Sequence, residues 1–347
     1  MSKTIQTRRV AHATLAALAL LVNMPADAKC RYSKFAALQL DTTQRSPLVE
    51  GVVNGQPIKV LLDTGATFTS LMRPMTERLE LPLSHTDGRM VGIGGDSEEY
   101  HASVKEFGFG PARWKNIRMA VIWDAQDTGI DALVGANYLL QNDIELLLQD
   151  KLIHFFKPED CKDTFLGYWD PDATVLPLID LRSGDLRAEV MIQVNGQPVR
   201  ALIDTGAQSS FIDEKTAAKL GVQKPADGSA LERTAIGIGT RKVATWVGRF
   251  DSVAIGPEVI QHTKLTVMDM WGAARRDLGY WGSGSLDNAP QMVLGADFLT
   301  SHRVLLAMSQ RKVYLSYLGG PVFATSAGKP AATPAAPEAP EAPASAP

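Results

Sequence analysis

The apolar positions of this chain form short runs separated by Asn-Gly turns, and the pattern occurs twice. Residues 53–66 read VNGQPIKVLLDTGA, and residues 194–207 read VNGQPVRALIDTGA, 141 positions further on. In each copy an apolar stretch turns at Asn-Gly and returns through a run rich in Val, Leu and Ile, which is the strongest short-range signal for a β-hairpin. The second strand of each predicted hairpin therefore ends in Asp-Thr-Gly-Ala.

Three further landmarks follow each copy in the same order. They are a short helix, an alternation of Gly and Ile suited to the tip of a flexible hairpin, and a buried strand that runs through glycine into a short helix. These landmarks fall at residues 71–81, 91–95 and 133–139 in the first half, and at residues 211–222, 235–239 and 293–299 in the second. Each half then closes with a predicted hairpin, at 144–155 and at 304–317. The shared order indicates an internal duplication.

The second half is the longer one. Asp63 and Gly135 are 72 positions apart, whereas Asp204 and Gly295 are 91 positions apart, so the second half carries 19 extra residues. Most of this insertion falls within residues 270–291, which are rich in Gly, Trp and Arg. We expect it to form either a surface excursion or a wall of a substrate cleft.

Both ends of the chain differ from the repeated unit. Residues 1–28 have the parts of an export signal: basic residues near the start, an apolar run at 13–22 and Ala-Asp-Ala at 26–28. That run is too short to span a bilayer, which needs about 20 residues. Residues 326–347 are rich in Ala and Pro, which predicts a disordered tail. We expect an exported protein, periplasmic or else secreted, with no stable membrane anchor after signal cleavage.

Composition and motifs exclude several classes of function. The 347 residues include 35 Lys and Arg against 38 Asp and Glu, a formal net charge of −3, so no nucleic-acid partner is expected. The sequence contains no H-E-x-x-H, G-x-S-x-G, P-loop or G-x-G-x-x-G, which argues against zinc hydrolases, serine esterases, NTPases and dinucleotide enzymes. We expect neither a metal nor a cofactor.

The chain has two cysteines, too few for a disulfide-stapled scaffold. In an oxidising compartment Cys30 and Cys161 could pair, which would join the start of the mature chain to the end of its first half. The alternative is that both are structural thiols. The sequence leaves both interpretations open, because it does not show whether the two Cα atoms come within about 7 Å.

Two aspartates at matching strand ends indicate a particular chemistry. A single Asp-Thr-Gly is a weak signal, because most such aspartates cap a turn. Pseudo-twofold packing of the halves would bring Asp63 and Asp204 together, and two neighbouring carboxylates share a proton. The ionised one can then take a proton from water while the protonated one hydrogen-bonds a carbonyl oxygen, so that water attacks an amide directly. We predict that these two aspartates are catalytic.

The residues that follow each aspartate have predicted supporting roles. Glycine lacks Cβ, so the backbone can approach the carboxylates closely and donate N–H groups. The threonine hydroxyls can bond across the pseudo-twofold axis. Alanine stands where a hydroxyl could have donated to the carboxylate, so the pair is expected to titrate less acidically than one with Ser or Thr there. The supporting residues are Thr64, Gly65, Ala66, Thr205, Gly206 and Ala207.

With its two Asp-Thr-Gly-Ala motifs, its Gly-Ile-Gly turns and its apolar-apolar-Gly elements, the chain resembles the retropepsin-like aspartic proteases of the pepsin–retropepsin superfamily, in their exported bacterial form. The resemblance covers about residues 34–320. It implies a mostly β fold of two pseudo-twofold-related β-barrel lobes with short helices and a substrate cleft between them. The expected flap residues over that cleft are Gly92, Ile93, Gly94, Gly237, Ile238 and Gly239.

The resulting division of the chain is a signal peptide at 1–28, an N-terminal lobe at 29–156, a linker at 157–174, a C-terminal lobe at 175–325 and the tail. The leading hypothesis is an aspartic endopeptidase that cleaves extended segments of proteins or peptides. The alternative is a peptide-binding module that keeps the fold but does not cleave. The two halves are expected to pair within one chain as an intramolecular pseudo-dimer, and pairing with a second chain is the other possibility.

Overall fold

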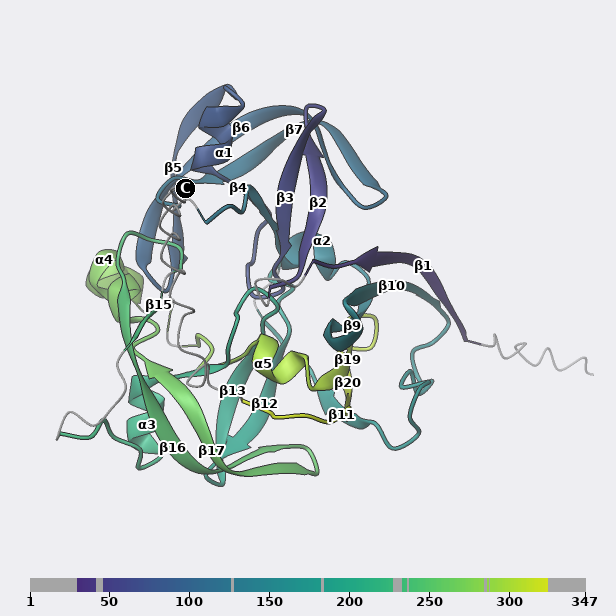
Figure 1. Ribbon diagram of the computed structural model, residues 1–347, viewed down its shortest axis with the longest axis vertical. Coiled ribbons are helices and arrows are strands. Elements are labelled where there is room, and N and C mark those ends of the chain that lie inside the picture. The colour runs from purple at the N-terminus through teal and green to yellow at the C-terminus, as the bar shows by residue number, and fades with distance from the viewer. Residues whose placement is uncertain are drawn as a thin grey trace, which may run out of the picture.

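The computed structural model describes residues 30–41, 46–125, 128–181, 184–226, 233–235, 237–283, 286 and 288–323. The predicted signal peptide (1–28) and the predicted tail (326–347) lie outside the described residues. Within the described ranges, the chain forms two lobes of β-sheet with a third sheet beside them (Figure 1).

The first lobe is a closed barrel of six strands. Pairing between its first and last strands closes it, and β5 (Leu83–Gly92) extends beyond the barrel from β6. In spatial order the barrel strands are β2 (Leu48–Val53), β3 (Gln56–Leu62), β8 (Ala132–Val134), β4 (Ser70–Met72), β7 (Ala112–Ile122) and β6 (Gly95–Phe109).

The second lobe repeats this topology strand for strand. Pairing between β12 and β16 closes it, and β15 (Arg233–Ala235) extends from β16 as β5 does from β6. The barrel strands are β12 (Glu189–Val194), β13 (Gln197–Ile203), β18 (Met292–Leu294), β14 (Phe211–Asp213), β17 (Glu258–Met268) and β16 (Val243–Ile255). The predicted mostly β fold of two related barrels is confirmed.

The Asn-Gly turns form the hairpins that the sequence predicts. Asn54 and Gly55 both have positive φ, 51° and 81°, and Asn195 and Gly196 repeat this at 48° and 71°. Consecutive positive φ values match the right-handed twist of the flanking strands, and Asn-Gly is the pair that adopts them most readily. The Asn54 side chain also accepts hydrogen bonds from two backbone N–H groups of β6, at 2.8 and 3.1 Å, so the turn is tied to the barrel.

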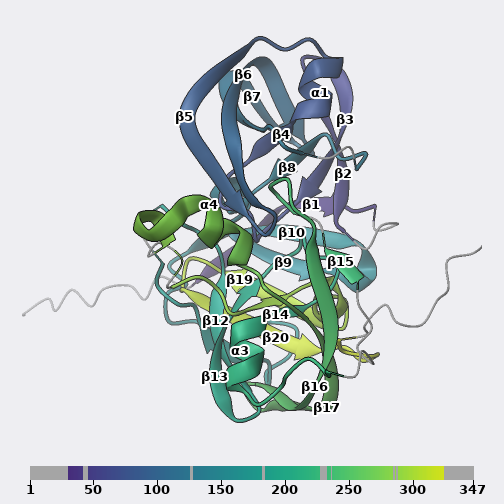
Figure 2. The same ribbon diagram turned by 90° about the vertical axis from the view of Figure 1, so that its left-hand side faces the viewer.

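The closing hairpins of the two halves meet in the third sheet, which the sequence does not predict. β9 (Asp143–Leu147) and β10 (Leu152–Glu159) come from the first half, and β19 (His302–Ala307) and β20 (Lys312–Tyr317) from the second. β9 pairs antiparallel with β19, so a single six-stranded sheet spans both halves, with β1 (Arg31–Gln39) and β11 (Thr174–Pro177) at its edges. In Figure 1 this sheet lies beside the second barrel, and in Figure 2, turned by 90°, it lies behind that barrel.

A disulfide fastens the start of this sheet. Cys30 and Cys161 are bonded, with their Cα atoms 4.4 Å apart, so the structure selects pairing over free thiols. Next to it, the Tyr32 ring stacks on Phe156, which lies on the neighbouring strand β10. The start of β1 is therefore held to the segment that follows the first half.

The helices are short and follow the repeat, with one exception. α1 (Arg73–Arg78) and α3 (Glu214–Lys219) are matching elements, as are α2 (Ala136–Leu139) and α5 (Ala296–Leu299), and one 3₁₀ turn (Leu148–Asp150) follows β9. α1 and α3 start later than the sequence predicts because the buried apolar residues before them enter the barrels as β4 and β14. The exception is α4 (Gly272–Ser283), which lies in the insertion of the second half.

Candidate active site

The two Asp-Thr-Gly-Ala segments meet where the barrels face each other. Asp63 follows β3, and its N–H donates to the Val134 carbonyl at 2.9 Å, while Asp204 follows β13 and donates to the Leu294 carbonyl at 3.0 Å. These bonds continue the parallel pairs β3–β8 and β13–β18. Each aspartate is thus placed by two strands of its own barrel.

The threonines lock the two segments together. The Thr64 N–H donates to Thr205 Oγ1 at 3.1 Å, and the Thr205 N–H donates to Thr64 Oγ1 at 3.0 Å. Each hydroxyl then donates to a backbone carbonyl of the opposite half, Thr64 to Ile203 at 2.8 Å and Thr205 to Leu62 at 2.6 Å. Both threonines are fully buried, so these four bonds are shielded from water. The structure places the predicted supporting threonines on the pseudo-twofold axis of one chain.

The glycines allow the carboxyl groups to approach. A Cβ added at Gly65 would lie 2.3 Å from Asp204 Cγ, and one at Gly206 would lie 2.5 Å from Asp63 Cγ. Each carboxyl group therefore rests on the backbone of the opposite motif, in the space that a side chain would fill. The two aspartates also hydrogen-bond to each other.

Backbone N–H groups hold both carboxyl groups in place. Asp63 Oδ1 accepts from the N–H groups of Gly65 and Ala66, both at 2.9 Å. Asp204 Oδ1 accepts in the same way from Gly206 at 2.8 Å and Ala207 at 3.2 Å. The alanine methyl groups supply no further donor, as the sequence predicts.

The environment raises the pKa of both aspartates. Burial raises the pKa of Asp63, and the hydrogen bonds from Ala66 and Asp204 oppose this shift. Burial raises the pKa of Asp204 well above its ordinary value, and the adjacent charge of Asp63 raises it further. The pair can therefore hold one proton under conditions in which isolated aspartates are ionised.

A second set of polar residues supports each motif, and it was not predicted from the sequence. Asn137 Oδ1 accepts from both the N–H and the hydroxyl of Thr69, each at 2.9 Å. In the other half Asp297 Oδ1 accepts from the N–H and hydroxyl of Ser210, at 2.7 and 2.6 Å. Asp297 therefore anchors the loop that carries Ser210. The sequence repeat contains a signal for these contacts, because Asn137 and Asp297 occupy matching positions in the two halves.

A cavity of about 970 Å³ lies over the aspartates, between the lobes and beneath the two predicted flaps. Its lining includes both aspartates, the flap residues Gly92, Ile93, Gly237 and Ile238, and Trp271 from the insertion. Ile93 packs against the apolar cluster of the second lobe, and Ile238 packs against that of the first, so each flap tip covers the opposite lobe. The insertion, for which the sequence left two interpretations, lines the cleft.

The flap tips are bonded to each other. The Gly94 N–H donates to the Ile238 carbonyl at 2.8 Å, and the Arg241 N–H donates to the Gly94 carbonyl at 3.1 Å. Gly239 has a φ of 104° and lies against Gly94, so its backbone conformation and its lack of a side chain are both needed there.

Asp277 of α4 connects both flap tips to the insertion, a role that was not predicted. Its carboxylate accepts from the Asp96 N–H of the first flap at 3.1 Å and forms an ion pair with Arg241 of the second. The bond from Arg241 lowers the pKa of Asp277 to about 2, so the carboxylate is ionised at neutral pH. One charged side chain thus holds both flaps in the arrangement seen here.

We expect Asp277→Asn to loosen the flap tips. The amide keeps an acceptor oxygen but loses the charge that attracts Arg241, so backbone amides at 94–96 and 241 should exchange with deuterium several-fold faster. The matched control is Asp131→Asn, because Asp131 also accepts from a backbone N–H and an arginine, neither of which belongs to a flap. Flap exchange rates equal in the Asp277 variant and the native protein would contradict the prediction.

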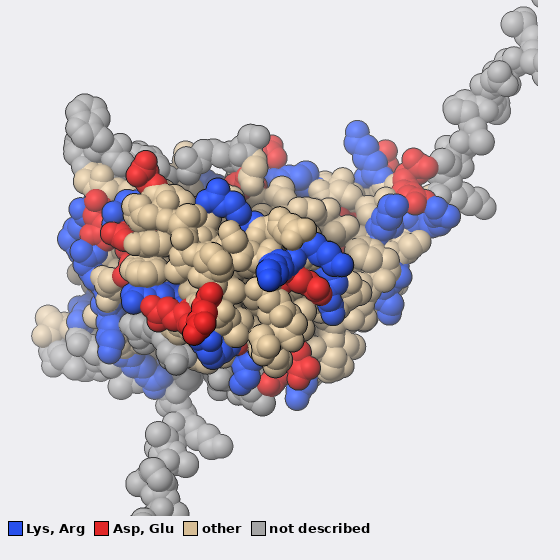
Figure 3. All heavy atoms as spheres, turned by 90° about the horizontal axis from the view of Figure 1, so that it is seen from above, with Lys and Arg blue, Asp and Glu red and all other residues tan. Residues whose placement is uncertain are grey.

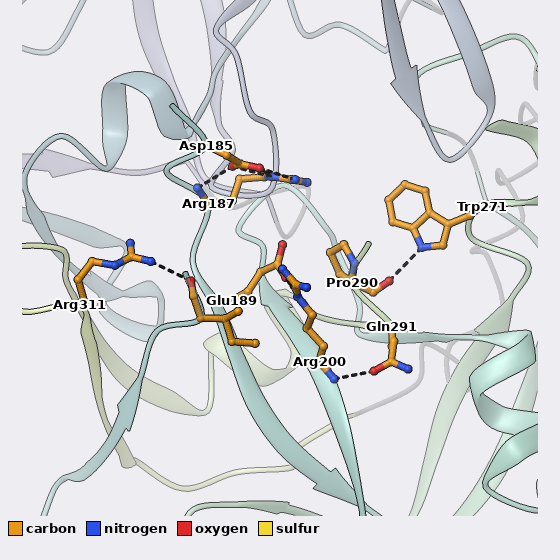
Figure 4. Close-up of polar contacts among 9 residues, drawn as sticks. Asp185, Arg187, Glu189, Arg200, Trp271, Pro290, Gln291 and Arg311 are labelled. Carbon is orange, nitrogen blue, oxygen red and sulfur yellow. Dashed lines mark hydrogen bonds and ion pairs between the residues drawn. The ribbon is translucent and has the colours of Figure 1, made fainter. Parts of the chain in front are cut away.

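The wall of the cleft that the second lobe forms carries charged side chains that were also not predicted. Arg187 is bonded to Asp185, and Arg200 to Glu189, and all four line the cavity (Figure 4). The sequence repeat contains a signal for this charged wall, because Glu189 occupies the position that Leu48 holds in the first half. In the described part of the chain, no cluster of three or more His, Cys, Asp or Glu could hold a metal ion.

Two barrels with an aspartate pair between them define the architecture of a two-lobe, retropepsin-like aspartic protease. The chain belongs to the aspartyl protease family, whose family model matches residues 49–138 and 190–298, one region in each half. Among solved structures, the aspartic proteinase from Irpex lacteus is similar, with 12% identity and a TM-score of 0.45 over 81% of this chain and 97% of that one. No curated protein sequence matches the chain.

Proposed function

We propose that this protein is an endopeptidase that hydrolyses peptide bonds in extended protein segments, using a water molecule activated between Asp63 and Asp204. The observation that carries the proposal is the mutual packing of the two carboxyl groups, each against the glycine of the opposite motif. Membership of the aspartyl protease family supports the same class of reaction.

In the proposed reaction the two aspartates have different protonation states. Asp204, whose pKa is raised the more, carries the proton and hydrogen-bonds the substrate carbonyl oxygen. Asp63 is ionised and takes a proton from water as the water attacks the carbonyl carbon, while Asp204 gives its proton to the carbonyl oxygen, so that a tetrahedral diol forms. The C–N bond of the diol then breaks as Asp63 returns its proton to the leaving amine and Asp204 takes one back from a diol hydroxyl. The closed flaps exclude bulk water and offer main-chain groups to an extended peptide.

The alternative is a module that binds peptides without cleaving them. A peptide library incubated with the protein over a series of pH values separates the two, with cleavage products identified by mass spectrometry. Cleavage that disappears in the Asp63→Asn variant supports the endopeptidase. Peptides that are retained by the native protein but never cut, at any pH, would support the binding module instead.

We expect Ala66→Ser to move the pH profile of cleavage toward lower pH. Activity requires one protonated and one ionised carboxyl group, so it falls at low pH when Asp63 is protonated and at high pH when the pair loses its last proton. A serine hydroxyl beside Asp63 can donate to the carboxylate, which favours the ionised form and opposes the shift caused by burial. The measurement is kcat/KM against pH, with Ala112→Ser on β7 as the control. A profile that stays in place or moves to higher pH contradicts the prediction.

We further propose that the protein is exported, in keeping with residues 1–28. The disulfide between Cys30 and Cys161 supports this, because such bonds persist in oxidising compartments. No helix in the described ranges is long and apolar enough to cross a membrane. On the face seen in Figure 3, acidic and basic side chains are interspersed. The test is expression in a bacterium with the leader: the periplasmic fraction should yield protein that begins at Lys29, and intact protein in the cytosol would contradict export.

A further inference from the structure

The two walls of the cleft differ beside the aspartate pair. On the first wall, Leu48 of β2 lies opposite Leu61 of β3 in the ladder. These two residues pack with Ile122 and Leu133 in an apolar cluster, and Ile122 and Leu133 line the cavity. This part of the first wall therefore suits an apolar substrate side chain, whereas β5, β6 and β7 of the same lobe line the cavity with Arg89, Glu99, His101 and Arg118.

On the second wall a charged residue stands at the matching position. Glu189 of β12 lies opposite Leu202 of β13 in the same register that joins Leu48 to Leu61. Its side chain is only 1% exposed and pairs with Nε of Arg200. The cavity is lined by Glu189, Arg200 and Leu202, so the second wall is charged at this position.

A second ion pair lies beside the first. The Arg187 guanidinium donates from Nε to both oxygens of Asp185, at 3.0 and 3.2 Å, and from Nη2 to Oδ2 at 2.7 Å. The corresponding residue in the first half is the buried Ser46. At these matched positions, guanidinium groups line the cleft only in the second lobe (Figure 4).

Both guanidinium groups stay partly exposed. The side chains of Arg187 and Arg200 are 20% and 19% exposed, and their partners Asp185 and Glu189 are 16% and 1% exposed. Neither Nη atom of Arg200, nor Nη1 of Arg187, donates a hydrogen bond to another residue in the described part of the chain. These N–H groups are donors that a ligand in the cleft can reach.

We propose that this subsite binds a substrate side chain ending in a carboxamide or carboxylate, that of Asn, Gln, Asp or Glu, through Arg187 and Arg200. The inference rests on the proteolytic function proposed above and specifies its substrates. The protein then cuts between a residue that fits the apolar wall and a neighbour whose acceptor oxygen reaches the guanidinium groups.

Other side chains are disfavoured for definite reasons. A leucine in this subsite strips water from the N–H groups of Arg187 and Arg200 and gives them no acceptor, and a donor left unpaired in this way opposes binding. A lysine ammonium offers no acceptor to these N–H groups, and Asp185 and Glu189 are already paired with the two guanidinium groups. Discrimination of this kind is stronger than selection by apolar fit alone, because it depends on buried polar groups being satisfied.

The first test uses the native protein. Peptides are built around a sequence cut in the library, and the residue on each side of the cleaved bond is varied in turn among Gln, Glu, Leu and Lys. At one of the two positions, Gln or Glu should raise kcat/KM about tenfold or more over Leu, with Lys lowest. Leu equal to or better than Gln at both positions overturns the inference.

The second test exchanges the charged pair for apolar residues. Glu189→Leu combined with Arg200→Leu removes both charges together, so neither is left buried alone, and Leu at 189 copies the first half. This variant should cut the Leu peptide faster and the Gln peptide more slowly than the native protein does. The control is Lys59→Leu, the exposed counterpart of Arg200, which should keep the native preference. An unchanged preference in the double variant contradicts the subsite.

The failure of this inference and the failure of the proposed function give different results. If the native protein cuts no peptide, the endopeptidase proposal fails, and the subsite is then tested by calorimetric binding of Gln and Leu variants of a library peptide that the protein retains. If peptides are cut without the stated preference, only the subsite fails. Should the double variant not fold, Arg187→Met should lower the preference for Gln in the same assay.

Discussion

Replacing either aspartate by asparagine is expected to abolish peptide cleavage. Asp63→Asn removes the base that takes the proton from water, and Asp204→Asn removes the acid that hydrogen-bonds the substrate carbonyl oxygen. Because the two act as a unit, each single variant should lose about as much activity as the double variant. We expect kcat/KM to fall by at least about 10⁴-fold in each, measured with a peptide that the native protein cuts.

The loss should come from chemistry and not from unfolding. Asparagine has nearly the shape of aspartate, and one fewer buried carboxylate removes part of the cost of burying charge. The melting temperature of each variant should therefore equal or exceed that of the native protein, and peptide binding should persist. Cleavage retained in either folded variant would show that the aspartate pair is not the catalytic group.

The duplicated motif explains why so much of the fold and site could be predicted. A hairpin signal, a Gly-Ile-Gly turn and an apolar strand entering glycine are all local patterns, and two copies of each imply a pseudo-twofold pair. Symmetry then places Asp63 beside Asp204 without any long-range information. The threonine bonds across the axis follow from the same reasoning, since the short hydroxyl of Thr64 has its counterpart in Thr205.

Apart from the matching Asn137 and Asp297 contacts, the unpredicted features are those in which the halves differ or join. The pairing of β9 with β19 joins strands more than 150 residues apart, and no local pattern specifies which edges meet. Asp277 lies in an insertion that has no counterpart in the first half, so symmetry gives no position for it. Glu189 was visible as a departure from Leu48, but only the structure places it in the cleft with Arg200.

The second large effect is expected at the motif glycines. Gly65→Ala would place a methyl group 2.3 Å from Asp204 Cγ, closer than any real contact, so the carboxyl group must move. Displacement breaks the bond between the aspartates and disturbs the threonine pair beside them, so cleavage should fall by about 10²-fold or more. Overpacking of this kind should also lower the free energy of unfolding by about 1–3 kcal/mol. Gly206→Ala should behave alike, because its Cβ would meet Asp63.

Gly55→Ala separates this steric effect from the general cost of replacing a glycine. Gly55 has a φ of 81° and no atom within 4 Å of an added Cβ, so alanine there strains the backbone but touches nothing. We expect a loss of about 1 kcal/mol in the free energy of unfolding with cleavage retained. We would measure kcat/KM and urea unfolding for Gly55→Ala, Gly65→Ala and Gly206→Ala. The comparison separates a clash with the opposite aspartate from backbone strain alone. Full activity in Gly65→Ala would mean that the carboxyl group of Asp204 does not rest against the opposite motif, and the shared-proton mechanism would lose its structural basis.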